Sequence, residues 1–333
     1  MAKKGTKTKV GQDKSEIVAE IPMACADEAT AVEFLERQRW GDCPCCPRCG
    51  DTDVYQMKAA DGTRNKRFLW RCRGCKQQYT VRIGTVFEES RIPLRHWCYA
   101  FWRACTSKKG VSALEIKRQT GLSYKSALFM MHRIRFAMAP TDGGPKLTGT
   151  VEVDETYVGG KPRHRIPQSP IPRQPGQKSN HETVKDRKTP VFAAVQRDGQ
   201  ARVRVLPEVT SQSLREAVLE HVDLSSRLMS DEHFGYIKVG QEFEGGHERI
   251  QHKNHIYVRG DVTTNTVEGF FSILKRGING VYHNVSRKHL QRYLDEFEFR
   301  YNHRKVEDGE RVVAAIQGAD GKRLMYREPT SNN

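Results

Sequence analysis

Three acidic residues stand at places where the surrounding sequence predicts regular structure. Asp154 lies in the run Val151–Tyr157, which alternates as a β-strand does, and Asp231 directly follows a short apolar strand at Arg227–Ser230. Glu268 lies in the first turn of a predicted helix. Carboxylates from two strands and one helix can hold two Mg²⁺ or Mn²⁺ ions about 3.5–4 Å apart, an arrangement that promotes phosphoryl transfer.

Other residues compete for places in such a site. Because successive side chains of a strand point to opposite faces, we expect Glu152 to share a face with Asp154 and Glu155 to point the other way. Glu298 is a further competitor. Asn265 shares a helix face with Glu268 and is a possible accessory residue. The residues alone therefore leave the choice of third acid open.

A second metal-binding pattern lies in the cysteines, all nine of which precede Thr106. Two CxxC pairs, separated by a strand-rich loop, suit a tetrahedral zinc site with four thiolate ligands: Cys46, Cys49, Cys72 and Cys75. Four thiolates leave no coordination position open, so this zinc is structural. Cys43 and Cys45 are alternative ligands. Cys25, Cys98 and Cys105 are expected to bind no metal.

The charge of the chain indicates a nucleic-acid partner. Lys and Arg number 56 against 40 Asp and Glu, for a formal net charge of +16. Ser112–Thr120 and Ser123–Met138 read as two helices joined at Gly121, which is a helix-turn-helix pattern. The predicted DNA-binding residues are basic and lie on two helices. The second helix of this pair carries Lys125, Arg133 and Arg135, and the predicted helix that contains Glu268 carries Lys275 and Arg276 about two turns later.

Composition divides the chain into successive regions. We expect a disordered basic arm over residues 1–20, a zinc ribbon with an N-terminal helix over 21–90, and a helix-turn-helix region over 91–140. An α/β catalytic domain would follow over 146–305, with a flexible basic insert at 161–189 and a tail at 306–333. No stretch is apolar enough to span a membrane and the N-terminus lacks a secretory pattern, so we expect a cytoplasmic, nucleoid-associated protein.

Several longer motifs resemble those of the ISXO-type insertion-sequence transposases, relatives of the Merlin elements. They are Gly149-Thr-Val-Glu-Val-Asp154-Glu-Thr-Tyr157, Ser230-Asp231-Glu-His233-Phe-Gly-Tyr236, Thr264-Asn265-Thr-Val-Glu268-Gly-Phe270 and Tyr293-Leu-Asp-Glu-Phe297-Glu-Phe-Arg300-Tyr-Asn302. The ribbon segment, running into Gly84-Thr-Val-Phe87, resembles the zinc ribbon of the same family. The resemblance covers most of the chain, from about Cys43 to Arg304.

This resemblance implies an RNase H-like mixed-sheet catalytic domain of the DDE type, preceded by a zinc ribbon and a helix-turn-helix region. It assigns the catalytic and Mg²⁺-binding roles to Asp154, Asp231 and Glu268. The implied partners are transposon-end and target double-stranded DNA, and joining two ends implies a homodimer or larger assembly. His233 and His283 are expected to be structural.

Two other functions remain compatible with parts of the sequence. A non-catalytic DNA-binding regulator would explain the charge and the cysteines but leave the acidic motifs unused. An RNase H-type nuclease would hydrolyse DNA without joining its ends. The expected activity is instead cleavage that leaves a 3′-OH, followed by attack of that 3′-OH on target DNA.

Overall fold

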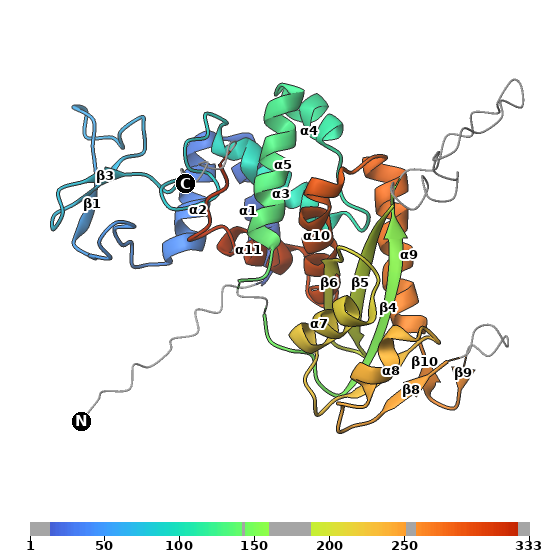
Figure 1. The fold of residues 1–333 in the computed structure, drawn as a ribbon. Coiled ribbons are helices and arrows are strands. Elements are labelled where there is room, and N and C mark those ends of the chain that lie inside the picture. The colour runs from blue at the N-terminus through green and yellow to red at the C-terminus, as the bar shows by residue number, and fades with distance from the viewer. Residues whose placement is uncertain (1–13, 142–143, 160–187, 251–257, 326–333) are drawn as a thin grey trace, which may run out of the picture. The chain divides into compact units, whose positions relative to one another are not determined.

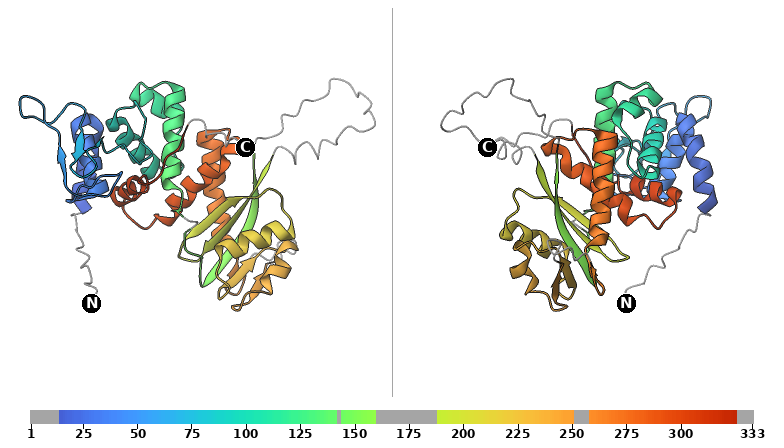
Figure 2. Two further views of the ribbon diagram at one scale, coloured as in Figure 1. Left: turned by 60° about the vertical axis from the view of Figure 1, so that its left-hand side comes forward. Right: turned by 90° about the vertical axis from the view of Figure 1, so that its right-hand side faces the viewer.

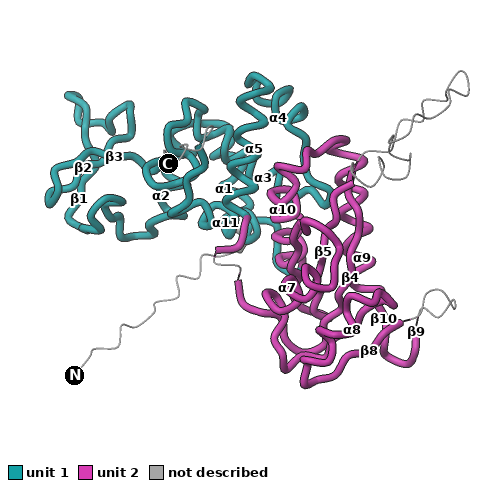
Figure 3. Tube along the Cα trace, viewed as in Figure 1, with its two compact units in different colours: residues 1–138, 305–333 teal, residues 139–304 magenta. Residues whose placement is uncertain are grey.

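The computed structural model describes residues 14–141, 144–159, 188–250 and 258–325. Residues 1–13 of the expected basic arm and nearly all of the expected insert lie outside the described residues. The chain divides into two compact units (Figure 3). Unit 1 comprises Met1–Met138 with Lys305–Asn333, and unit 2 comprises Ala139–Arg304.

A five-stranded mixed sheet forms the centre of unit 2. Its strands are β4 (Thr150–Val158), β5 (Thr189–Gln196), β6 (Ala201–Val205), β7 (Arg227–Ser230) and β8 (His247–Arg249). The order across the sheet is β6-β5-β4-β7-β8. The first three strands are mutually antiparallel, whereas β7 and β8 run parallel to β4. This order and these directions are those of an RNase H-like fold, so the predicted fold class is confirmed.

Helices cover both faces of this sheet (Figures 1 and 2). One face packs on α7 (Ser211–His221) and α8 (Gly235–Gly240), through a core that includes Val151 and Val153. The other packs on α9 (Asn265–Gly277) and α10 (Leu290–Asn302). A π-helix, η3 (Ile278–Tyr282), a 3₁₀ helix, η4 (Arg287–His289), and a two-stranded ribbon, β9 (Val258–Arg259) with β10 (Val262–Thr263), complete the described part of unit 2.

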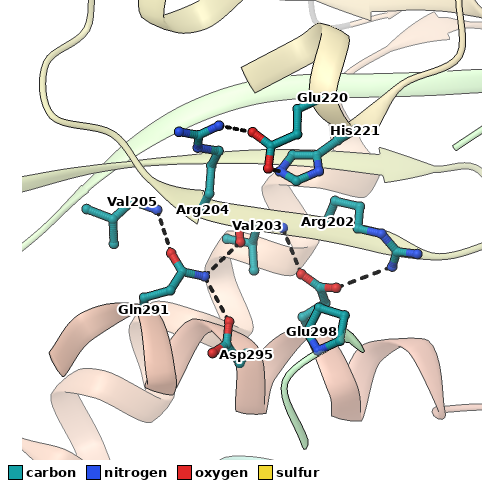
Figure 4. A pocket seen from close by; sticks show the side chains of 10 residues that line it. Arg202, Val203, Arg204, Val205, Glu220, His221, Gln291, Asp295 and Glu298 are labelled. Atoms are coloured by element: carbon teal, nitrogen blue, oxygen red, sulfur yellow. Dashed lines mark hydrogen bonds and ion pairs between the residues drawn. The ribbon is translucent and has the colours of Figure 1, made fainter. Parts of the chain in front are cut away.

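The outer edge of the sheet, strand β6, is bonded to side chains of α10 (Figure 4). The backbone amides of Ala201, Val203 and Val205 donate to Asn302 Oδ1, Glu298 Oε2 and Gln291 Oε1 over 2.7, 2.9 and 2.9 Å. In return, the amide groups of Gln291 and Asn302 donate to the carbonyls of Val203 and Ala201 over 3.1 Å each. These bonds fix α10 against the sheet.

The described part of unit 1 contains a small sheet and a group of helices. The sheet contains β1 (Val54–Gln56), β2 (Trp70–Cys72) and β3 (Gln78–Tyr79). The helices are α1 (Lys14–Ala26), α2 (Glu28–Trp40), α3 (Leu94–Thr106), α4 (Ala113–Thr120), α5 (Tyr124–Met138) and α11 (Asp308–Gln317). The predicted pair α4 and α5 is joined through Gly121, whose φ of 72° is left-handed.

Two stretches differ from the sequence interpretation. Residues 14–20, expected to belong to a disordered arm, are part of α1, whose Ile17, Ile21 and Ala24 are buried. The expected C-terminal tail contains α11, with Val312 and Ile316 buried. Each helix hides an apolar stripe against neighbours distant in the sequence, since α1 contacts α3 and α11. Among the described residues, no helix combines the length and apolar composition of a membrane span.

Candidate active site and zinc centre

Three carboxylates converge at the end of strand β7. Asp154, Glu155 and Asp231 each place an oxygen so that all three atoms lie within 4.8 Å of one another. Parallel pairing explains why the two aspartates meet. Val153 of β4 lies opposite Ser230 of β7, and the residue that follows each of them is an aspartate, Asp154 or Asp231. The Asp231 side chain accepts a 3.0 Å hydrogen bond from the backbone amide of His233, which holds it at the strand end.

Glu155 is held in this cluster by Tyr236 of α8. The Tyr236 hydroxyl donates to Glu155 Oε2 over 2.7 Å, and the tyrosine is wholly buried. His233 Nε2 lies 4.0 Å from Glu155 Oε1. Strand alternation predicted that Glu155 would point away from Asp154, and it does lie toward the α8 face. However, the pairing of β7 with β4 ends at Val153, so Asp231 lies beyond the paired residues. Asp154 on one face of β4 and Glu155 on the other can therefore both reach it.

Glu152, one of the competing acids, makes structural contacts instead. It is completely buried, and Arg197 Nε donates to its Oε1 over 2.8 Å. Its Oε2 accepts the backbone amides of Thr266 and Val267 over 2.7 and 3.1 Å, at the start of α9. A carboxylate at a helix N-terminus interacts favourably with the helix dipole. Glu152 thus binds the first turn of α9 to β4. Glu298 also makes structural contacts, because it accepts the backbone amide of Val203 and pairs with Arg202, both on β6.

Glu268 lies in the first turn of α9 with its side chain exposed. Its Oε1 accepts a 2.9 Å hydrogen bond from the Thr264 hydroxyl. Its charge is the smallest of the named contributions to the raised pKa of Asp154, and it is not among the three acids whose oxygens lie within 4.8 Å of one another. Asn265 is exposed one turn earlier, and its backbone amide donates a hydrogen bond to the Thr263 hydroxyl over 3.1 Å. The tight three-acid group therefore contains Glu155, with Glu268 at its periphery.

Burial and crowding of like charges dominate the electrostatics of the cluster. Burial, together with the charges of Asp231 and Glu155, raises the pKa of Asp154 from 3.8 to about 8. Burial also raises the pKa of Glu155, opposed by the hydrogen bond from Tyr236. Without a cation, this site disfavours its own ionised form. A divalent cation would relieve both effects.

We expect the metal-free protein to lose stability as the pH rises from about 4 to about 8, because Asp154 keeps a proton in the folded state that the unfolded chain has released. The contribution of this group is fully present below its unfolded pKa and is lost as the pH passes its folded pKa. The resulting slope of the free energy of unfolding against pH cannot exceed about 1.4 kcal/mol per pH unit for one proton. Asp154→Asn should flatten the dependence. Urea unfolding at several pH values in EDTA measures it, and equal slopes for both proteins would contradict the assignment.

Loss of the Glu152 carboxylate should weaken unit 2. Glu152→Ala leaves Arg197 and two amides of α9 without their buried partner, so we expect the free energy of unfolding to fall by about 3–5 kcal/mol. The matched substitution Glu216→Ala, on the exposed side of α7, should change it by no more than about 0.5 kcal/mol. Denaturant unfolding of both variants is the measurement, and similar small losses would show that Glu152 has no anchoring role.

The four predicted zinc ligands come together in unit 1. Sulfur atoms of Cys46, Cys49, Cys72 and Cys75 all lie within 4.8 Å of one another. The Cys46–Cys75 and Cys49–Cys72 separations are both 3.7 Å. A zinc tetrahedron with Zn–S bonds of about 2.3 Å requires sulfur separations of about 3.8 Å, so the group fits zinc. Backbone amides of Arg48 and Cys49 outweigh the effect of burial and lower the pKa of Cys46 to about 7, which favours the thiolate.

The remaining cysteines stand apart from this centre. Cys43 is exposed and Cys45 is half-buried, and neither belongs to the four-sulfur group. Cys98 and Cys105 are buried in α3. The ribbon is anchored to α2 by Glu36, whose Oε1 accepts from Trp70 Nε1 over 2.7 Å and from Arg64 Nη2 over 2.5 Å. The metal centre and this buried network together fix the ribbon sheet.

The predicted DNA-binding residues fall into two groups. Lys125, Lys275 and Arg276 are exposed. Arg133 and Arg135 are buried, with exposed fractions of 7% and 1%. Arg133 donates to the carbonyls of Val86, Glu88 and Leu324 over 2.8–3.1 Å. The burial of both side chains contradicts the prediction that they face DNA, and the guanidinium of Arg133 is used for contacts inside unit 1.

Comparison with known protein families agrees with this arrangement. A family model described as ISXO2-like transposase domain matches residues 146–302, which include the acids of the candidate active site. A second, described as transposase zinc-ribbon domain, matches residues 26–78. An uncharacterized protein in transposable element ISH50 of Halobacterium salinarum is 27% identical over 278 residues, covering 82% of this chain and 90% of the relative.

Two solved structures have weak overall similarity to the chain. One belongs to a simian T-cell lymphotropic virus intasome in complex with PP2A regulatory subunit B56 gamma, with 13% identity and a TM-score of 0.27. That match spans 55% of this chain and 63% of the other. The second belongs to a pre-cleavage Mos1 transpososome, with 12% identity, a TM-score of 0.26, and coverage of 94% and 99%. The fold assignment rests on the sheet order and not on these matches.

Proposed function

We propose that this chain, which matches the ISXO2-like transposase domain over residues 146–302 and the transposase zinc-ribbon domain over residues 26–78, cleaves DNA at transposon ends and joins the resulting 3′-OH ends to target DNA. The observation that carries this proposal is that Asp154, in the middle of β4, meets Asp231, at the end of the neighbouring strand β7, in an RNase H-like sheet. Their neighbours Glu155 and Glu268 approach from opposite sides, one toward α8 and the other on α9. This supports a multi-carboxylate metal site.

The donor set fits Mg²⁺ or Mn²⁺. All its ligand atoms are carboxylate oxygens, which these hard cations prefer. The raised pKa values of Asp154 and Glu155 indicate an excess of negative charge that bound cations would neutralise. We propose that Asp154 and Asp231 hold metal, with Glu268 as the third catalytic acid and Glu155 as a further ligand. When bound, a pair of such ions would activate the attacking oxygen and stabilise the leaving oxygen.

The protein groups around the acids would position them and the DNA. Glu152 ties the first turn of α9 to β4 two residues before Asp154, so it also sets the position of Glu268 relative to Asp154. Tyr236 orients Glu155 through its hydroxyl. Lys275 and Arg276 lie about two turns beyond Glu268 on α9 and are exposed, so they can bind phosphates beside the site. Asn265 is proposed as an accessory residue.

Unit 1 supplies the proposed recognition of DNA. In a helix-turn-helix, the N-terminal residues of the second helix contact base edges. The corresponding residues of α5, Ser123, Tyr124 and Lys125, are exposed, as are Lys117 and Arg118 of α4. We propose that these helices and the zinc ribbon bind the terminal inverted repeats, that two or more chains assemble to join two ends, and that the protein acts at the nucleoid.

A strand-transfer assay tests this function. Full-length protein is incubated with Mg²⁺, a labelled duplex carrying one end of the DNA element that encodes it, and a supercoiled plasmid target. We expect labelled end joined to plasmid. Cleaved duplex without joined product would favour a nuclease that only hydrolyses. A shifted but uncut duplex would favour a non-catalytic regulator.

A further inference from the structure

The outer face of the ribbon sheet carries one row of side chains aligned by strand pairing. Tyr55 of β1 lies opposite Arg71 of β2, and Arg71 lies opposite Gln78 of β3. Because side chains alternate along strands, this outer row lies opposite the face formed by Trp70, Cys72 and Tyr79, which are buried. The outer row therefore faces away from the zinc centre and the ribbon core.

The outer row is available to a partner. Tyr55 and Gln78 are exposed and Arg71 is half-exposed. Within the ranges that the structure describes, the guanidinium of Arg71 has no hydrogen bond or ion pair with another residue, and neither has the Gln78 side-chain amide. By contrast, Arg64 and Arg82 of the same ribbon are committed to internal partners, Glu36 and the carbonyls of Ser90 and Ile92.

Positive charge surrounds the outer row. Residues 43–85 contain nine Lys or Arg against three Asp, and residues 62–85 contain no acid. Four thiolates with one Zn²⁺ carry a charge of −2, which still leaves the ribbon positive. The guanidinium carbon of Arg73 lies 5.4 Å from the centre of the Tyr55 ring, and Arg73 Nε lies 3.5 Å from Asp53 Oδ1. Both charged side chains are about two-thirds exposed, so this ion pair is weak and Arg73 can exchange it for a phosphate.

We propose that the outer row enters the major groove of duplex DNA and that Arg71 reads a base pair there, with Gln78 reading an adjacent one. This rests on the proposed function and names a surface that selects the DNA end. Arg pairs with guanine O6 and N7 through two hydrogen bonds, and Gln pairs similarly with adenine N6 and N7. Small β-sheets fit the major groove. Neighbouring strands are about 4.8 Å apart, which lies between one and two base-pair steps of about 3.4 Å, so long side chains from adjacent strands can reach neighbouring base pairs. Arg73 and Lys76, both exposed, flank the row and would bind phosphates.

The test uses full-length protein and a duplex library with a randomised core. Wild type is used to select bound sequences, and the best selected duplex then becomes the binding probe. The variants are Arg71→Ala, Arg71→Lys and Lys58→Ala. Lys58 is an exposed cation of the ribbon outside the row, so its removal controls for loss of charge. Arg71→Lys keeps the charge but loses the two-pronged geometry. Zinc content of every variant reports whether the ribbon is intact.

We expect both Arg71 variants to weaken binding to the selected duplex by about 5-fold to 150-fold and to lose preference at one base pair. Lys58→Ala should weaken selected and scrambled duplexes equally and keep the preference. The proposal is overturned if zinc-replete Arg71→Lys retains the full preference, or if Lys58→Ala loses it equally. Strand transfer by wild type with no dependence on Arg71 would reject this proposal alone. Selection that depends on Arg71 without strand transfer would reject the proposed function alone.

Discussion

Asp231→Asn is expected to lower strand cleavage and joining by about 1000-fold or more while leaving duplex binding intact. Asp231 lies at the end of β7 with Asp154 and Glu155, and an amide cannot supply the negative charge that a divalent cation requires. The substitution keeps the shape of the side chain and its acceptor for the His233 amide. It should therefore preserve the fold of unit 2. Removing a negative charge should, if anything, tighten binding to DNA.

The measurement is the strand-transfer assay at saturating Mg²⁺, paired with a gel-shift titration of the same duplex. Asp223→Asn is the matched control, because Asp223 caps a loop through Ser225 on the same unit and is not part of the acid cluster. It should keep wild-type activity. If Asp231→Asn retains more than about a tenth of wild-type joining, the site does not depend on this acid.

Cys72→Ser is expected to release zinc from the ribbon and unfold it locally. Cys72 is fully buried, its sulfur lies 3.7 Å from that of Cys49, and it belongs to β2, so one change removes both a predicted ligand and part of the core. Structural zinc contributes about 10–16 kcal/mol of apparent binding free energy in small domains, and that energy stabilises their fold. We expect zinc affinity to fall by at least about 100-fold, together with the selective binding of DNA.

Zinc content after dialysis against a weak chelator, and limited proteolysis of residues 43–85, report this change. Cys43→Ser is the control, since Cys43 is exposed and outside the four-sulfur group. It should retain zinc and resist proteolysis as wild type does. If Cys43→Ser loses zinc while Cys72→Ser retains it, Cys43 is a zinc ligand and the four-sulfur group is not the ligand set.

Local patterns in the sequence were sufficient for much of the architecture. The alternation around Asp154 predicted β4, and the apolar run before Asp231 predicted β7. The spacing of two CxxC pairs predicted the four-sulfur group. These features depend on residues close together in the chain. The order of strands in the sheet came instead from family resemblance, because pairing between distant strands leaves little local signal.

The errors came from contacts made at long range. Arg133 looked like a DNA ligand on a basic helix, but its partner Leu324 is 191 residues away in the chain. Alternation correctly placed Glu155 on the opposite face of β4 from Asp154, but it could not show that Asp231, which lies beyond the strand pairing, is within reach of acids on both faces. Glu152 carries no local mark of its buried contacts with Arg197 and α9. Its position inside an apolar strand did signal that it must have a partner.

The bonding of β6 to α10 has a consequence for self-association. An edge strand with unpaired amides is a template on which a second chain can add a strand, leading to domain swapping or aggregation. Here the amides of Ala201, Val203 and Val205 already have partners in Asn302, Glu298 and Gln291. A strand from another chain would have to displace three side chains fixed on one helix. This edge is therefore closed to sheet extension, and the multi-chain assembly that we propose would have to form through other surfaces.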